Sequence, residues 1–252
     1  MTRVQPVLDM GWRYLPLLLL ALLWEGISQT GLISQYALPP LSGVLASWWE
    51  LIQTSNYWDN LLASLSRGAR GLGAAIVVGI TLGVLMAWFK PVDATVGPIV
   101  QIFYPMPKSA LIPLTIIWFG LGDMSKIFLI FLGCLLPVLI NTFNGVRGAE
   151  RTLVWSARSL GATRTRILWD VAFFSAVPDI LTGVRTAMAL GFVLLISSEL
   201  VIASNGLGFM IRLMGEGGYF PEMFAVIFTV MLLGFVADRS FLALSRWLLR
   251  WR

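Results

Sequence analysis

The sequence predicts an all-α, polytopic membrane protein with about six transmembrane helices. Of its 252 residues, 58% are hydrophobic and only 12% are charged, whereas soluble domains carry about 25% charged residues. The mean hydropathy is +0.82. Apolar runs long enough to cross a bilayer, for which about 20 residues suffice, recur along the chain. We therefore expect a single transmembrane domain over residues 1–252.

Composition also narrows the possible functions. The chain has no histidine, so it lacks the commonest general base and transition-metal ligand. The single cysteine, Cys134, cannot form an intrachain disulfide. Since the carboxylates are dispersed, we expect no catalytic residue and no metal site, and an intramembrane enzyme is disfavoured. The net charge of +5 is typical of arginine-rich cytoplasmic loops rather than of nucleic-acid binding.

The N-terminal part, residues 1–58, predicts one span and one amphipathic helix. The span covers about 12–30 and is interpreted as a retained helix, with Glu25 at the interface or facing protein. Ser42 can cap a second helix over 42–54. That helix either lies in the membrane interface or packs against the protein. Its apolar stripe comprises Leu45, Trp48, Trp49 and Ile52.

The second span, about 61–88, is rich in glycine. Gly79 and Gly83 form a small-xxx-small pair, which lets two helices approach closely. Arg67 and Arg70 lie near the start of this span. We expect both arginines to extend to the membrane interface rather than contact substrate.

The third span, about 94–119, is predicted to be broken. It contains Pro105, Pro107 and Pro113, and three prolines cannot sit in one regular helix without lost hydrogen bonds. Broken backbone at membrane depth requires surrounding protein or a water-filled cavity. Lys108 lies within this segment and is a candidate pathway residue.

The remaining spans cover about 124–145, 177–203 and 223–247, with a Gly-rich outer connection over 205–222. Glu199 in the fifth span either gates or contacts substrate, or is paired within the bundle or wetted at its outer end. The candidate residues of a translocation pathway are Pro105, Pro107, Lys108, Ser197, Ser198 and Glu199.

A basic elbow over residues 147–178 joins the fourth and fifth spans. Leu153, Ala157 and Leu160 follow helical spacing. Gly161 can end that helix in the left-handed conformation, and Thr163 can cap a second short helix. We expect the apolar faces of both elbow helices to attach the elbow to its bundle. A generic basic cytoplasmic loop is the alternative.

Two stretches carry a family resemblance. The elbow, from Ala157 through Thr163 and again at Leu181-Thr182-Gly183, resembles the EAA loop of bacterial ABC-importer permeases, although Trp155-Ser156-Ala157 replaces the usual Glu-Ala-Ala. The segment YPMPKSALIPLTIIWFGLGD resembles the third-helix signature of the nitrate, sulfonate and taurine branch. The resemblance implies a type I ABC-importer permease fold, with a core transport bundle over 59–252 and the elbow as coupling helix. The coupling residues that it implies are Arg151, Trp155, Ser156, Ala157, Arg158, Leu160, Gly161, Ala162 and Thr163.

The resemblance also implies partners and a substrate class. The chain has no G-x-x-x-x-G-K-[ST] loop, so ATP and Mg would bind to separate ATPase subunits and this chain would bind no cofactor. The expected assembly holds two copies of the permease, two ATPases and an extracytoplasmic solute-binding protein. Its expected substrate is a small anion such as a sulfonate, taurine or nitrate. A stand-alone secondary carrier or channel is the alternative.

The distribution of charge predicts the topology. Six spans put both termini on one side. Placing the termini in the cytoplasm puts the elbow arginines there too, together with Arg3, Arg13, Lys90 and the C-terminal arginines Arg246, Arg250 and Arg252. That arrangement follows the positive-inside tendency of bacterial inner-membrane proteins. We therefore expect a multi-pass protein of the cell membrane with a cytoplasmic elbow.

Overall fold

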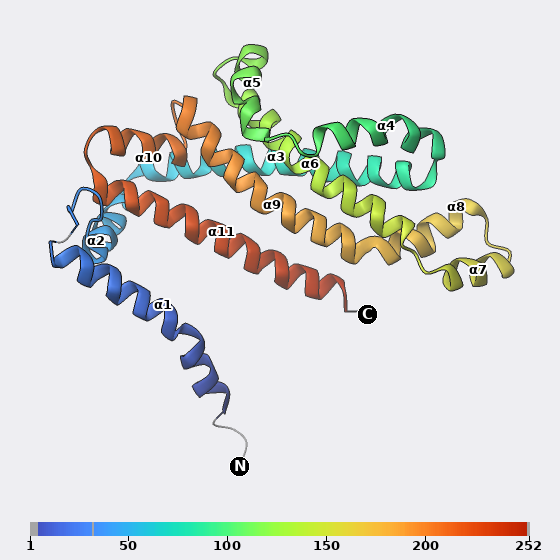
Figure 1. Ribbon diagram of the computed structural model, residues 1–252, viewed down its shortest axis with the longest axis horizontal. Coiled ribbons are helices and arrows are strands. Elements are labelled where there is room, and N and C mark those ends of the chain that lie inside the picture. The colour runs from blue at the N-terminus through green and yellow to red at the C-terminus, as the bar shows by residue number, and fades with distance from the viewer. Residues whose placement is uncertain (1–4, 32, 251–252) are drawn as a thin grey trace. The chain divides into compact units, whose positions relative to one another are not determined.

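The computed structural model describes residues 5–31 and 33–250, so Arg3 and Arg252, two of the arginines at the termini, lie outside it. The described residues form helices and connecting turns, without a strand (Figure 1). The helices are α1 (Gln5–Gln29), α2 (Leu41–Leu51), α3 (Ser55–Trp88), α4 (Lys90–Phe103), α5 (Ile112–Phe119), α6 (Asp123–Arg147), α7 (Arg151–Ser159), α8 (Arg164–Ile167), α9 (Phe174–Ile202), α10 (Leu207–Glu216) and α11 (Phe220–Leu248). A 3-10 turn covers Lys108–Leu111, and a π-helical segment covers Leu168–Phe173.

Four helical segments among the described residues are long and apolar enough to cross a membrane: Ser55–Trp88, Asp123–Arg147, Arg164–Val201 and Phe220–Leu248. The predicted broken span is confirmed, because Lys90–Phe103 and Lys108–Phe119 together pass the same test but are bent by 94°. The described part of α1 adds a shorter apolar stretch, Leu15–Gln29. The described residues thus contain four spans, or up to five with the bent pair counted as one, and Leu15–Gln29 is the shorter segment at the place of the first of the six expected spans.

The chain divides into two compact units, and each is described by itself. The first comprises Met1–Asn60 and Met210–Met231. Within it, the indole of Trp48 donates to the Thr229 hydroxyl over 3.0 Å, and the Tyr57 hydroxyl lies 3.0 Å from the same oxygen. Trp48 also packs edge-on against Phe228. The packed alternative for this helix therefore holds for Trp48, whereas Trp49 on the same helix is exposed.

The N-terminus of α2 is capped differently from the prediction. Pro40 occupies the cap position and no side chain caps the helix there. Ser42 instead donates its backbone N–H and its hydroxyl to Glu25, over 3.1 and 2.8 Å. The Glu25 carboxylate thus accepts a backbone donor in the first turn of α2, a location that favours negative charge. Its position facing protein agrees with one of the two predicted environments.

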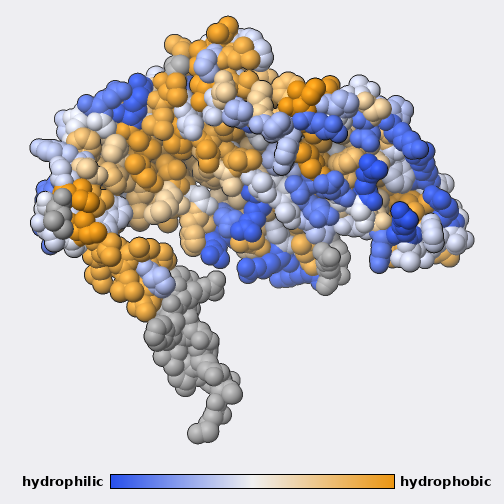
Figure 2. All heavy atoms as spheres, viewed as in Figure 1, coloured by the Kyte–Doolittle hydropathy of each residue, from blue (hydrophilic) through white to orange (hydrophobic). Residues whose placement is uncertain are grey.

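The second unit, Leu61–Phe209 with Leu232–Arg252, contains the main core. Helices α6 and α9 pack along much of their length. Their contact buries Leu129, Ile130 and Val138 on α6 against Ala187 and Leu194 on α9. Figure 2 shows hydrophilic residues gathered at the end of this unit that carries α7 and α8. The apolar body of the unit suits a bilayer, and its charged end suits an aqueous or headgroup environment.

Glycines bring α3 against α6, as the Gly79 and Gly83 pair predicts. A Cβ on Gly79 would lie 2.9 Å from Val138 Cβ, and one on Gly83 would lie 2.7 Å from the Leu139 carbonyl oxygen. Gly71 has a similar approach to Ile130. The missing side chains therefore allow the two backbones to come close, which is the usual route to tight helix packing in membranes.

Gly83→Ala should destabilise this contact by about 1–3 kcal/mol, because the added methyl group meets backbone that cannot yield. Gly73→Ala is the matched control, since nothing lies within 4 Å of a Cβ at that position on the same helix. It should be neutral or stabilising by up to about 1 kcal/mol. Thermal unfolding can be followed by labelling of the buried Cys134 with a maleimide dye. The temperature at which the thiol becomes reactive is compared between the two variants and the wild type. Equal shifts for both variants would contradict the close approach.

The connection predicted over 205–222 contains a helix, α10, that was not predicted from the sequence. Its first turn is held by residues of α3 and α9: Leu207 donates its N–H to the Ser64 hydroxyl over 2.8 Å, and Gly208 donates to the Glu199 carboxylate over 3.0 Å. The glycine-rich sequence suggested a loop. The glycines instead allow this segment to approach Glu199 closely, since a Cβ on Gly206 would lie 2.5 Å from the carboxylate carbon.

Candidate functional site

The elbow has the predicted helix-Gly-helix geometry. Helix α7 ends at Ser159, and Gly161 follows with a φ of +81°, a conformation that L side chains rarely adopt. Thr163 caps α8, its side chain accepting from the backbone N–H of Arg166 over 3.4 Å. The reversal of chain direction at Gly161 places α7 and α8 side by side beyond the ends of α6 and α9 (Figure 1).

The two elbow helices differ in how they attach to the bundle. Ile167 and Leu168, at the end of α8 and just after it, are buried in the second unit together with Ala172. Helix α7 has no buried residue, so the expectation that its apolar face packs on the bundle is wrong. Leu160 is 88% exposed and Trp155 is 63% exposed. The apolar side chains at the tip of the elbow are therefore available to another subunit.

The second half of the elbow is continuous with the fifth span. Helix α8 passes through the π-helical segment Leu168–Phe173 directly into α9, and Arg164–Val201 forms one helical run of 38 residues. π-Helical turns inside longer helices occur frequently at functional sites. A force on the elbow would thus be transmitted along a single helix into the membrane region.

The pocket next to the broken span has a volume of about 560 Å³ and is largely apolar. Of the predicted pathway residues, Lys108 and Ser197 line it, whereas Ser198 and Glu199 do not. Pro105 and Pro107 lie in the bend between α4 and α5. The Ser198 hydroxyl donates to the Leu195 carbonyl within α9, over 2.8 Å.

Lys108 has a structural role that the sequence did not suggest. Its ammonium donates to the carbonyl oxygens of Phe103, Tyr104 and Met106 over 2.6, 3.3 and 2.7 Å. An ammonium has three donors, so all of them are satisfied. Lys108 therefore caps the C-terminal end of α4 at the break, and its charge reaches the pocket without a free N–H.

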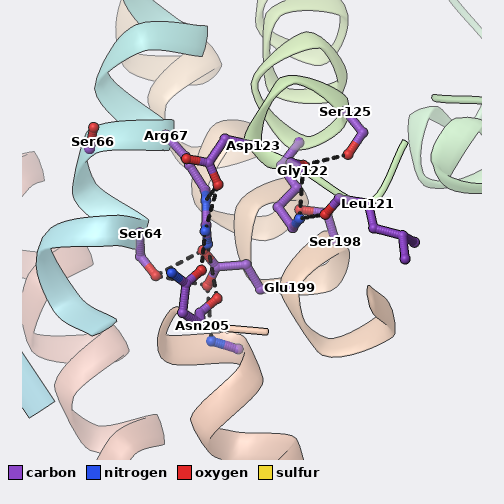
Figure 3. A network of polar contacts seen from close by, with 12 residues as sticks. Ser64, Ser66, Arg67, Leu121, Gly122, Asp123, Ser125, Ser198, Glu199 and Asn205 are labelled. Atoms are coloured by element: carbon purple, nitrogen blue, oxygen red, sulfur yellow. Dashed lines mark hydrogen bonds and ion pairs between the residues drawn. The ribbon is translucent and has the colours of Figure 1, made fainter. Parts of the chain in front are cut away.

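A buried polar network joins α3, α6 and α9 at the other end of the unit (Figure 3). Arg67 is 3% exposed and Glu199 is 0% exposed, and their side chains are 2.7 Å apart. Arg67 also pairs with Asp123 at 2.7 Å and donates to the backbone oxygen of Asn205 at 3.0 Å and to its side-chain oxygen. The Ser64 hydroxyl lies 2.7 and 2.9 Å from the two Glu199 oxygens.

The network corrects the expectation for Arg67, which does not extend to the membrane interface. Arg70 on the next turn is exposed and bonds only to Ser66 among the contacts of the described chain. Glu199 occupies the paired environment that was one of its two predicted settings. The predicted spans contain a signal for this ion pair, because Arg67 lies near the start of the second span and Glu199 lies near the end of the fifth. In a six-span topology both positions lie near the same surface of the membrane.

Comparisons with known proteins agree with this geometry. Residues 76–250 match the family described as "Binding-protein-dependent transport system inner membrane component". The chain is 35% identical to the taurine transport system permease protein TauC of Escherichia coli strain K12, over 93% of this chain and 87% of that protein. It is 33% identical to SsuC of Bacillus subtilis strain 168, a permease protein assigned by name to aliphatic sulfonates, over 96% and 88%.

A solved structure supports the fold. The fold resembles a chain of the MetNI methionine ABC transporter in an inward-facing conformation, with a TM-score of 0.63 and 21% identity, over 75% of this chain and 94% of that one. The all-α type I importer fold is thereby confirmed. The family match and the identity to full-length permeases lead to one conclusion: this chain belongs to the inner membrane components of binding-protein-dependent transport systems, the permease subunits of ABC importers.

Proposed function

We propose that this permease imports a small anion under the control of an ATPase that binds the elbow on the cytoplasmic side. The observation that carries the proposal is the exposed apolar tip formed by Trp155 and Leu160, built on a helix hairpin whose second arm continues into α9. Large apolar side chains that are exposed together on an otherwise polar and charged segment favour a protein interface. A generic solvated loop would not require them.

Family membership implies ATPase and binding-protein partners, and we infer the stoichiometry from the fold class. The assembly contains a second copy of the permease, two ATPases carrying ATP and Mg, and one extracytoplasmic binding protein. Both termini lie in the cytoplasm. The cluster of elbow arginines supports this orientation, since cytoplasmic loops carry an excess of Lys and Arg. The alternative of a carrier working alone has no support among the relatives.

The mechanism follows from the continuity of α8 and α9. When two ATPases close on ATP, they draw the two elbows together. The helical run Arg164–Val201 rotates as one body, and the packed partner α6 follows because its contact with α9 is extensive. Closure thus shifts the population from an inward-open to an outward-open packing, driven by the differential affinity of ATP for the closed ATPases.

The substrate that we favour is a sulfonate, with taurine or nitrate as close chemical variants. The relatives named for taurine and aliphatic sulfonates support this choice. The pocket of about 560 Å³ offers hydroxyl and amide groups of Ser109, Asn141 and Ser197 beside the charge of Lys108. Because all three N–H donors of Lys108 are occupied, we expect its ammonium group to act on the substrate through charge alone.

Leu160→Glu should abolish co-purification of the ATPase without loss of permease from the membrane, because the side chain is 88% exposed and contributes little to folding. Burying the new carboxylate in an apolar cleft would weaken the complex at least about tenfold. Tyr219→Glu is the matched control, since Tyr219 is 62% exposed beyond α10. The assay is pull-down of tagged permease with co-expressed ATPase. Retention of the ATPase by Leu160→Glu would reject the docking assignment.

A further inference from the structure

A basic pocket lies where the ends of α3 and α6 meet the start of α4 and the elbow. It has a volume of about 510 Å³, and four cationic side chains line it together with one carboxylate: Lys90, Arg147, Arg158, Arg164 and Asp93. Arg147 approaches that carboxylate at 3.7 Å. Within the described chain, the ion pairs leave the other three cations without a carboxylate partner. The pocket therefore presents an excess of positive charge.

Aromatic rings hold two of these cations in place. The Arg164 guanidinium lies over the Trp88 ring, with Cζ 5.4 Å from the centroid, and donates to the Trp88 carbonyl oxygen over 3.0 Å. The Arg147 guanidinium lies over the Phe143 ring at 5.1 Å. A stacked guanidinium keeps its planar donors directed. Although these cations remain solvent-exposed, the two stacked guanidiniums are oriented to receive an oxyanion.

An apolar groove continues from the basic pocket. A second cavity of about 540 Å³ lies between α4 and α6 and is lined by apolar side chains such as Val100 and Leu139. It shares Met86, Asp93 and Arg147 with the basic pocket. A free anion would use the basic pocket alone. A ligand with an anionic head and a long apolar chain would fill both.

We propose that the two cavities bind one anionic phospholipid of the cytoplasmic leaflet. Its phosphate lies among Arg147, Arg158 and Arg164, and an acyl chain follows the groove between α4 and α6. The inference rests on the proposed cytoplasmic orientation of the elbow. Basic pockets between transmembrane helices on that side are suited to anionic headgroups. The lipid would touch both arms of the hairpin and so connect the elbow to the membrane surface.

Native mass spectrometry of the full-length permease in detergent tests the proposal, with phosphatidylglycerol or phosphatidylcholine of equal chain length added. The wild type should retain phosphatidylglycerol preferentially. The double variant Arg147→Gln/Arg164→Gln should lose that preference by about twenty- to thirtyfold, because each cation near an anionic surface contributes roughly fivefold. Arg166→Gln is the control for charge alone: it removes one positive charge from α8, but Arg166 pairs with Asp170 and does not line the pocket.

Three outcomes would overturn the proposal. Equal retention of both lipids by the wild type excludes an anionic site. A loss of about fivefold in Arg166→Gln, which equals the loss per charge in the double variant, would assign the preference to general surface charge. Displacement of the lipid by free methanesulfonate assigns the pocket to the substrate path instead. If the double variant aggregates on size exclusion, Val100→Phe replaces it, since filling the groove should lower lipid retention with every cation kept. ATP-driven taurine uptake, measured on the same preparations, tests the proposed function separately.

Discussion

Arg67→Ala should lower the amount of folded protein more than the loss of any other side chain in the buried network. The change removes the guanidinium partner of the Glu199 carboxylate, which is 0% exposed, although the Ser64 hydroxyl and the Gly208 N–H still donate to it. Breaking a buried ion pair by removing one member destabilises by about 3–5 kcal/mol. We expect a sharp fall in monodisperse yield, and exposure of Cys134 at a much lower temperature in the protein that survives.

The other members of the network provide graded controls. Glu199→Ala should destabilise less than Arg67→Ala, because the guanidinium would keep Asp123 and Asn205 as partners. Asp123→Asn should have a small effect, since this carboxylate is 51% exposed and solvent screens its pairing with Arg67. The double variant Arg67→Ala/Glu199→Ala should lose less stability than the sum of the losses in the two single variants, as expected for residues in contact. Strict additivity would show that the pair does not couple α3 to α9.

The parts of the fold that sequence could predict depend on strong local chemistry. A proline removes a helical hydrogen bond, and the closely spaced Pro105 and Pro107 located the break in the third span, whereas the isolated Pro98, Pro137 and Pro178 lie inside helices. Glycine tolerates the left-handed conformation, so Gly161 located the bend of the elbow, where its φ is +81°. Spans of uniform apolar character located α3, α6, α9 and α11, with ends that shift by a few residues. Each of these signals acts within a few residues of its cause.

The parts that could not be predicted depend on long-range partners. Helix α10 was not predicted within the connection over 205–222, because its first turn depends on Ser64, 143 residues away in the sequence, as well as on the nearby Glu199. Arg67 was assigned to the membrane interface, since periodicity says nothing about which helix lies opposite. The exposed apolar face of α7 was assigned to the bundle for the same reason. A hydrophobic stripe indicates burial but does not identify the partner, which here we propose to be another subunit.

Gly161→Pro should abolish substrate uptake while the permease still inserts into the membrane. The proline ring fixes φ near −65°, and the native φ at this position is +81°, so the chain cannot reverse direction between α7 and α8. The bend would be rebuilt and the tip residue Leu160 displaced from the ATPase. We expect ATP hydrolysis to continue at its basal rate without stimulation by loaded binding protein. Substrate uptake and ATP hydrolysis, measured together on proteoliposomes, give the number of substrate molecules imported per ATP hydrolysed, which should fall to near zero.

Gly161→Asn separates backbone geometry from side-chain bulk. Nothing lies within 4 Å of a Cβ at this position, so a larger residue meets no steric obstacle, and asparagine tolerates the left-handed region better than most L residues. Asn at 161 should therefore retain most of the uptake, whereas valine, similar in size but β-branched, should lose it together with proline. Full activity of the proline variant would mean that the bend does not transmit the motion. Equal loss in the asparagine and valine variants would instead point to a direct contact of this position with the ATPase.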